Sequence, residues 1–274
     1  MFKKICSVLI ILCSLTAMCS CGENTTAGSD NTEVTQSLET EYSDISENIE
    51  PNKQTEANTE EQKETQQTSS YSIDTLDDLE NKIIEDIENN ISALAAEYEN
   101  LSNSISSYDV YVNNIESVEA FYDKVSSSFY AMTVKAYEYS LTYADAVINS
   151  GISCDDMYDS IEGIYDCVYS DVGDALYDDI YSGILDDMYE YFYSGVVEDG
   201  YDTVPYKDWY KISHDAYSYW DDTRSDCYDY WSDMKSDIFN LWSDLRKAFF
   251  EDNLEKAQKI VNDFREDVEK LKES

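Results

Sequence analysis

The sequence predicts an all-α protein, an elongated antiparallel helical bundle with long amphipathic helices that follows a disordered tether. Three observations predict it. The chain of 274 residues has only 8 Gly and 2 Pro, far below the roughly 12% that these turn residues usually contribute. Apolar residues recur every three or four positions, and internal repeats of twelve and eleven residues suit helices. A doubly wound α/β enzyme or a many-stranded β protein would need more turn residues.

Residues 1–21 have the order of an export signal. Lys3 and Lys4 precede an apolar run from Ile5 to Ala17, and small residues with cysteines follow. The run is shorter than the roughly 20 residues that a membrane-spanning helix needs. We therefore expect a signal peptide here and no membrane-spanning helix.

The end of this segment resembles the lipobox of bacterial lipoproteins. Ser20 and Gly22 fit the positions on either side of Cys21, Met18 stands where Leu is usual, and Cys19 departs from the pattern. The resemblance implies that Cys21 is the lipid attachment residue, which anchors the mature chain to the outer face of the cell membrane. The alternative is a freely secreted protein, but the segment has no Ala-x-Ala cleavage site.

Residues 22–70 are rich in Thr, Glu, Asn, Ser and Gln, with Lys53 and Lys63 as the only bases. This composition predicts a disordered acidic linker with a reach of about 40 Å. The whole chain has a formal charge of -41, and loss of Lys3 and Lys4 would leave 59 acidic against 16 basic residues, or -43. Such a chain should stand off the anionic surface that anchors it.

From Tyr71 the pattern becomes helical and predicts a helical domain over 71–274. The apolar stripe of the first helix consists of Leu76, Leu79, Ile83, Ile87, Ile91, Leu94, Tyr98, Leu101 and Ile105. Asp74 is its predicted N-cap, and a break is expected over 107–114. The pair Asn113 and Glu116 resembles a capping box for a second helix.

This second helix should reach Asn149, with Gly151 as its C-terminal stop. Ser153 with Asp156 three residues later should open the third helix.

A twelve-residue repeat occupies the third segment. Its copies begin at Tyr165, Tyr177 and Tyr189, and a fourth starts at Tyr201. Twelve residues of α-helix advance about 120° beyond three turns, so the apolar stripe should wind around the helix. Either different neighbours contact this helix along its length, or it kinks at Gly163, Gly173, Gly183 and Gly195. A buried, mildly kinked helix is the favoured prediction.

An eleven-residue repeat follows Pro205, with Trp209, Trp220, Trp231 and Trp242 equally spaced. Three other columns share the period: Ile212, Thr223, Met234 and Leu245; Ala216, Cys227, Ile238 and Phe249; Tyr217, Tyr228, Phe239 and Phe250. Eleven residues in three turns keep a seam nearly parallel to the helix axis. The Trp column is thus expected to fill the bundle core, rather than to form a platform for carbohydrate or aromatic ligands. Asp252 and Glu255 resemble a capping box that opens a last helix.

Few residues are suited to catalysis or metal binding. His214 is the only histidine, and its column also holds Ser225, Ser236 and Lys247, which predicts a solvated surface side chain. The acid pairs are Asp155-Asp156, Asp178-Asp179, Asp186-Asp187 and Asp221-Asp222. Paired acids could serve glycoside hydrolysis, but such a composition produces them by chance. We expect no catalytic residue, no metal site and no cofactor, while the ligand-binding residues stay unknown.

Export permits disulfides, and an antiparallel hairpin centred near residue 197 could bring Cys167 and Cys227 together. The favoured state is nevertheless a buried thiol, since Cys227 lies in a core column. Cys154 and Cys167 are thirteen residues apart on one helix, too far to bridge.

The predicted function is that of a membrane-anchored lipoprotein, a structural or interaction module of the cell envelope and not an enzyme. Its charge opposes nucleic acid binding and favours a cationic envelope or protein partner. Two alternatives remain, a wall or glycan hydrolase that uses paired carboxylates and a transporter-associated ligand-binding lipoprotein. The oligomeric state stays open.

Overall fold

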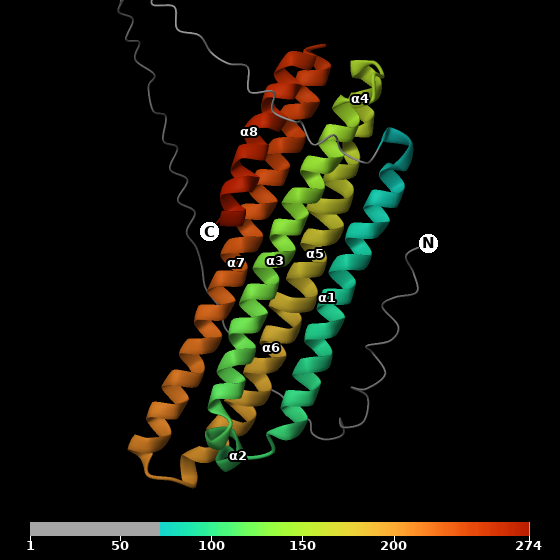
Figure 1. The fold of residues 1–274 in the computed structure, drawn as a ribbon. Helices are drawn as coiled ribbons and strands as arrows, with labels where there is room; N and C mark the ends of the chain where they lie inside the picture. The colour runs from blue at the N-terminus through green and yellow to red at the C-terminus, as the bar shows by residue number, and fades with distance from the viewer. Residues whose placement is uncertain (1–71, 274) are drawn as a thin grey trace, which may run out of the picture. The chain divides into compact units, whose positions relative to one another are not determined.

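The computed structural model describes residues 72–273, which form an all-α bundle without a strand in that range (Figure 1). The predicted signal peptide, with Cys21, and the predicted linker over 22–70 lie outside the described residues. Within 72–273, no helix is both long and apolar enough to cross a membrane.

Three helices form the first half of the bundle. α1 (Leu76–Ser104) follows a 3-10 turn (Ile73–Thr75), and the short α2 (Tyr108–Asn113) fills the predicted break before α3 (Ile115–Ile148). Ser107 is the N-cap of α2, where its side chain accepts a hydrogen bond from the Val110 amide.

Two predicted caps in this half are wrong. The N-cap of α1 is Thr75, not Asp74, since the 3-10 turn comes first. The N-cap of α3 is Asn114, not Asn113, and the Asn114 side chain donates to the Val110 carbonyl instead of capping α3. Here the preceding helix competes for the polar side chain.

The turn after α3 follows the prediction. Gly151 has a φ of 73°, the left-handed region that glycine adopts without strain. Ser153 then caps α4 (Cys154–Ser160), and its Oγ accepts from the Asp156 amide at 3.2 Å.

The helix that contains the twelve-residue repeat is largely a π-helix. Its π segments are η3 (Ile164–Val172), η4 (Leu176–Ile184) and η5 (Tyr189–Val197), separated by α5 (Gly173–Ala175) and α6 (Leu185–Met188). The amides of Gly173, Leu185 and Glu198 donate to carbonyls five residues earlier, as π-helical bonding requires. We call residues 154–199 the tyrosine-rich helix.

This π-helical bonding corrects the expectation of a winding stripe with kinks. Buried side chains recur at every fourth position: Ile164, Val168, Val172, Leu176, Ile180, Ile184, Met188, Phe192 and Val196. In an α-helix a four-residue step drifts by about 40°, so nine such positions would spread almost around the helix. Because π segments hold more residues per turn, twelve residues complete about three turns and the stripe stays straight.

The tyrosine-rich helix and α7 (Tyr206–Phe250) form a helical hairpin, joined through a 3-10 turn (Gly200–Asp202). α7 is a continuous α-helix of 45 residues. α8 (Leu254–Glu273) folds back after a turn in which Asp252 has a φ of 53°. The predicted capping residue of α8 is wrong by one position. Asn253 accepts the Lys256 amide at 3.0 Å through its Oδ1, while Asp252 serves the turn.

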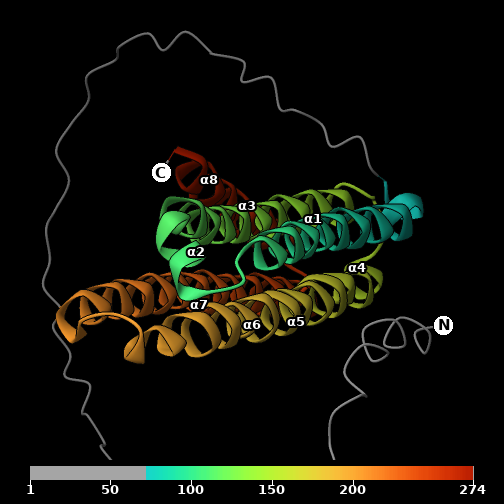
Figure 2. The same cartoon turned by 90° about the horizontal axis from the view of Figure 1, so that it is seen from below.

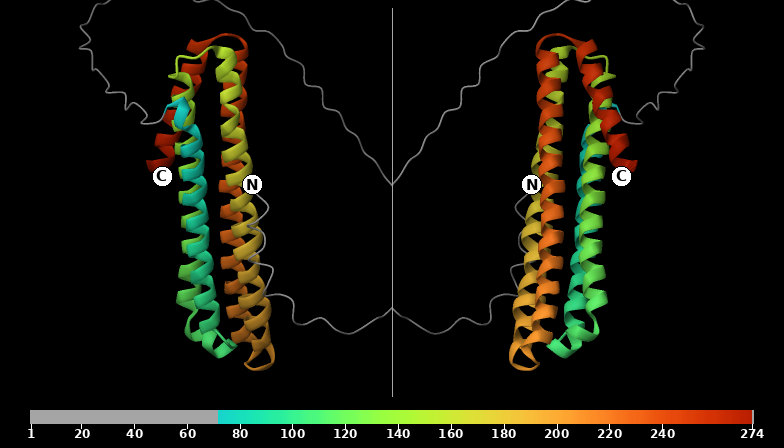
Figure 3. Two further views of the ribbon diagram at one scale, coloured as in Figure 1. Left: turned by 90° about the vertical axis from the view of Figure 1, so that its right-hand side faces the viewer. Right: turned by 90° about the vertical axis from the view of Figure 1, so that its left-hand side faces the viewer.

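Four long helices, α1, α3, the tyrosine-rich helix and α7, run alongside one another (Figures 1 and 2). α8 is shorter and packs on α3 and α7 at the end where α7 finishes (Figure 3). The core lies between these helices, and its largest fully buried side chains include Phe129, Phe192 and Phe249.

The hendecad columns of α7 differ in burial. Ala216, Cys227, Ile238 and Phe249 are all buried, as predicted. The Trp column is not the core column that the spacing suggested, because only Trp220 is fully buried and the other three Trp lie half-buried at its margin. The column of Tyr217, Tyr228, Phe239 and Phe250 is exposed.

Candidate functional site

The seam between the tyrosine-rich helix and α7 carries three aromatic clusters, and a fourth lies where the turn Gly200–Asp202 meets the start of α7. Their members are Tyr165, Tyr169, Phe239 and Trp242 in the first; Tyr177, Tyr181, Tyr228 and Trp231 in the second; Tyr189, Tyr193, Tyr217 and Trp220 in the third; Tyr201, Tyr206, Trp209 and Tyr210 in the fourth. We call this series the aromatic ladder.

The first three clusters share one geometry. Within each, two tyrosines four residues apart stack with ring centroids 4.8, 4.9 and 5.1 Å apart. The Trp of α7 packs on the first tyrosine of each pair, at 4.7, 4.9 and 4.4 Å. These distances between ring centroids are typical of favourable aromatic pairs. In the fourth cluster Tyr201 meets Trp209 edge to face at 4.9 Å.

The clusters stay in register because both repeats span three helical turns. Eleven residues of α7 rise about 16.5 Å, and the wider π-containing helix uses twelve residues over the same length. Each Trp of α7 therefore contacts the equivalent residue in successive twelve-residue repeats. Neither repeat alone reveals this match, which depends on the π segments.

Hydrogen bonds fix the indoles in this register. Nε1 of Trp209, Trp220 and Trp231 donates to the carbonyls of Val197, Leu185 and Gly173 at 2.8, 3.0 and 2.8 Å. Those acceptors are spaced by twelve residues, and the Trp donors by eleven.

Trp242 is the exception among these indoles. Its Nε1 is buried and finds no acceptor in the described part of the chain. The repeat would place its acceptor at Ile161, where the chain makes a turn and the carbonyl accepts the Ile164 amide at 3.2 Å.

Three basic side chains of α7, also eleven residues apart, lie over the rings. Arg224 lies 4.7 Å from the centre of Tyr181 and 5.1 Å from Trp220. The corresponding distances are 3.9 and 5.6 Å for Lys235 with Tyr169 and Trp231, and 4.1 and 5.0 Å for Arg246 with Tyr158 and Trp242. Each basic side chain thus makes cation–π interactions with two rings, a Trp of α7 and a Tyr of the tyrosine-rich helix.

Each cation also meets a carboxylate of the tyrosine-rich helix. Arg224 pairs with Asp186 at 3.6 Å, Lys235 with Asp174 at 3.3 Å and Arg246 with Glu162 at 2.8 Å. Gly173 makes room for the lysine, because a Cβ there would lie 2.6 Å from Lys235 Cδ.

The outer edge of the ladder is open to solvent. The exposed column of α7 continues to Tyr206, which is 61% exposed, and ends at Phe250, which is 81% exposed. Tyr201 and Tyr210 extend this surface at the end near Pro205. Aromatic side chains grouped on a surface indicate an interaction site.

The acidic residues of the tyrosine-rich helix lie in different surroundings: Asp186 lies beside the ladder, whereas the Asp187 carbonyl accepts from Tyr98 of α1. Asp171, Asp179 and Asp187 have pKa values above the ordinary 3.8, because burial disfavours their charge and neighbouring carboxylates repel it. Asp186 pairs with Arg224, and Asp156 belongs to the cap of α4. In the described range no three His, Cys, Asp or Glu residues cluster as a metal site would require.

A groove of about 520 Å³ lies along α7 and α8. Its walls carry Asp237, Asp244, Asp263 and Asp267, and Phe264 and Leu271 are among its apolar lining. The Tyr137 hydroxyl donates to Asp237 Oδ2 at 3.0 Å, and burial raises the pKa of Asp237.

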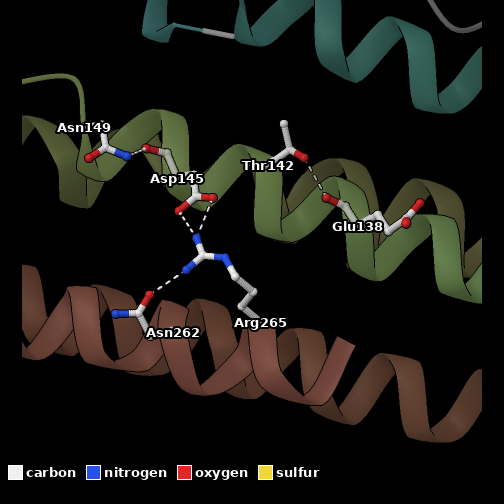
Figure 4. Close-up of polar contacts among 6 residues, drawn as sticks. All are labelled: Glu138, Thr142, Asp145, Asn149, Asn262 and Arg265. Carbon is white, nitrogen blue, oxygen red and sulfur yellow. Dashed lines mark hydrogen bonds and ion pairs between the residues drawn. The ribbon is translucent and has the colours of Figure 1, made fainter. Parts of the chain in front are cut away.

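An Arg265 fork attaches α8 to α3 next to this groove. Arg265 Nη2 donates to both carboxylate oxygens of Asp145 at 2.7 Å, and Nη1 donates to Asn262 (Figure 4). Asn149 in turn donates to the backbone carbonyl of Asp145. One guanidinium nitrogen contacts both carboxylate oxygens in a charge-assisted interaction, which joins α8 to α3.

The other candidates are structural. His214 is exposed, as predicted, and pairs with its neighbour Asp215 at 3.7 Å. Cys167 and Cys227 are buried free thiols, so the disulfide hypothesis is wrong and the favoured buried-thiol state is confirmed. Burial raises the pKa of each thiol to about 12, which leaves them unreactive.

Comparisons add no family assignment: no family model, no curated protein and no solved structure matches this chain. The aromatic ladder is the arrangement that sequence reasoning missed. The spacing of basic residues by eleven and of acidic residues by twelve could have indicated it, had the two periods been aligned.

Proposed function

We propose that this chain is an exported lipoprotein that is anchored through Cys21 and presents an acidic helical bundle as an interaction module of the cell envelope. Its localisation would be the outer face of the cell membrane. The Lys3-Lys4 start, the apolar run and Ser20-Cys21-Gly22 support the anchor. A diacylated cysteine supplies two acyl chains, enough for stable attachment.

The aromatic ladder supports the interaction role. It places half-exposed rings in four clusters along one face of the bundle, beside carboxylates. With a formal charge of -41, the chain should attract basic partners and repel nucleic acid. No cofactor enters this function.

The two alternatives gain less support. A hydrolase would need two carboxylates that face each other across a cleft, whereas Asp178-Asp179 and Asp186-Asp187 are neighbours in sequence on one helix. A transporter-associated receptor would need a ligand site, for which the groove along α7 and α8 is the most suitable place.

Replacement of the lipidated residue tests the anchor. The Cys21→Ala variant should move from the membrane fraction to the soluble or secreted fraction, because the acyl chains are lost. Cys19→Ala is the matched control and should stay with the membrane. Retention of Cys21→Ala in the membrane fraction, at the wild-type level, would contradict the proposal.

A further inference from the structure

Three repeats of the aromatic ladder enclose a cation in the same way. Each combines a Trp of α7, the basic residue four positions later, and a Tyr and an acid of the tyrosine-rich helix. The sets are Trp220, Arg224, Tyr181 and Asp186; Trp231, Lys235, Tyr169 and Asp174; Trp242, Arg246, Tyr158 and Glu162. The basic residues are eleven apart and the acids are twelve apart. The tyrosines are twelve apart from Tyr169 to Tyr181 but eleven apart from Tyr158 to Tyr169.

The fourth repeat keeps the Trp, the Tyr and the acid, but Ser213 stands at the position of the basic residue, and its two lysines, Lys207 and Lys211, lie at other positions. One step of eleven back along α7 leads from Arg224 to Ser213, and from Trp220 to Trp209. One step of twelve forward leads from Tyr181 to Tyr193, and from Asp186 to Glu198.

Two contacts confirm that this register continues. Trp209 Nε1 donates to the Val197 carbonyl, just as Trp220, one repeat away, donates to Leu185 and Trp231, two repeats away, donates to Gly173. Ser213 Oγ lies 3.5 Å from the Tyr193 hydroxyl, to which it donates. Ser213 thus lies beside Tyr193, at the hydroxyl end of the ring, whereas Arg224 lies over the ring face of Tyr181, the equivalent tyrosine.

We propose that Tyr193, Trp209 and Glu198 bind a guanidinium or alkylammonium group that comes from outside the chain. The rings would hold the cation by its attraction to their π faces, and Glu198 would neutralise its charge. Among residues 72–273 no ion pair includes Glu198, so its carboxylate is available. We call this the cation site.

The source that fits best is an arginine or lysine side chain of a basic protein partner. This assignment rests on the proposed interaction function, whereas the cation site itself rests on the repeat. At the three internal sites the exposed fraction of the cation is 33% for Arg224, 27% for Arg246 and 14% for Lys235. The same approach from solvent would let a partner's side chain enter beside Ser213, which is itself 5% exposed and forms the floor.

The four indole N–H signals of the full-length chain provide a direct test by NMR. N-acetylarginine amide and butylammonium serve as probes, and N-acetylcitrulline amide is the neutral control of the same shape. We expect the Trp209 signal to shift saturably with both cations at millimolar concentration, as a single exposed cation–π site implies. The signals of Trp220, Trp231 and Trp242 should move little, because internal cations occupy their sites.

Two reciprocal variants sharpen the test. Ser213→Arg supplies the missing internal cation and should weaken binding of both probes at least tenfold. Arg224→Ser removes an internal cation, so Trp220 should become a second responding indole. Glu198→Gln should weaken binding about threefold to tenfold and reduce its dependence on salt; it also tests the site if Ser213→Arg does not fold.

The proposal is overturned if Trp209 does not respond, if all four indoles respond alike, or if the citrulline control acts as strongly as the arginine probe. A response to butylammonium without one to the arginine probe would exclude a guanidinium ligand and restrict the site to ammonium groups. None of these outcomes depends on Cys21, so failure of the anchor and failure of the cation site are separable.

Discussion

The tyrosine-rich helix and α7 lie side by side, carry similar aromatic residues and make opposite use of helical geometry. α7 repeats every eleven residues and is a regular α-helix of 45 residues. Its neighbour repeats every twelve residues and contains three π segments of nine residues. Both complete about three turns per repeat, so a sequence period predicts the residues per turn only when the number of turns is known.

The largest expected difference between the two helices is the loss of stability when one residue is deleted from each. Deletion of exposed Ser236 rotates the rest of α7 by about 100° and takes Ile238, Leu241 and Leu245 from the core. Each buried side chain contributes about 1.5–3 kcal/mol, so the loss should exceed about 4 kcal/mol in chemical unfolding. Deletion of exposed Ser182 should cost much less, since segment η4 can revert to α-helix and restore the register.

Equal losses for the two deletions would contradict the proposed role of the π segments. Circular dichroism of both variants should show that the helical content is retained where the fold persists.

The indole hydrogen bonds allow a smaller test of whether the repeats are equivalent. Trp231→Phe keeps an aromatic ring but removes the donor to the Gly173 carbonyl, and should cost about 1 kcal/mol beyond the change in ring size. Trp242→Phe removes a buried Nε1 that has no acceptor within 72–273. Trp242→Phe should therefore reduce the free energy of unfolding by less than Trp231→Phe does, as measured by denaturant midpoints. A larger loss for Trp242→Phe would contradict a stabilising role of the Trp231 hydrogen bond.

The smallest expected effect concerns how stability depends on pH. The carboxyls of the tyrosine-rich helix should contribute more to this dependence than those of α7. Burial raises the pKa of Asp171, Asp179 and Asp187 on the tyrosine-rich helix. A carboxyl whose pKa is higher in the folded state binds more protons there, so stability rises as the pH falls through the raised pKa toward the ordinary value of 3.8.

The melting temperature should thus increase on mild acidification from pH 7. Asp171→Asn, Asp179→Asn and Asp187→Asn together should stabilise the protein at pH 7 and flatten this dependence. Asp237 on α7 also has a raised pKa, so Asp237→Asn alone should flatten it less. An unchanged slope in the triple variant would show that these three carboxyls do not govern it.

Local sequence signals predicted the helix limits well where one strong preference acted alone. Gly151 forms the turn that follows α3, and Ser153 caps α4. The predictions for Asp74, Asn113 and Asp252 were wrong by one residue or one short turn, because several polar side chains stand together there. The hydrogen bonds of the folded turns decide between such neighbours.

The ladder was harder to predict from sequence. The sequence pattern predicts that Trp209 and its column are buried in the core, because they repeat in phase with Ile212, Met234 and Leu245. In the structure the tyrosine-rich helix covers only one side of the Trp column, which leaves Trp209, Trp231 and Trp242 half-buried. A column's period shows that it lies on one face, whereas the neighbouring helices determine how deeply that face is buried.

The sequence by itself determined the all-α fold, since few turn residues and long apolar periods leave no other way to bury the chain. It also determined the two repeats and the large negative charge. Only the tertiary structure decided that twelve residues make three turns, which Trp finds an acceptor, and where a fourth cation would lie. Those properties depend on the relation between two helices, because a ring or a charge is placed by the partner that it meets.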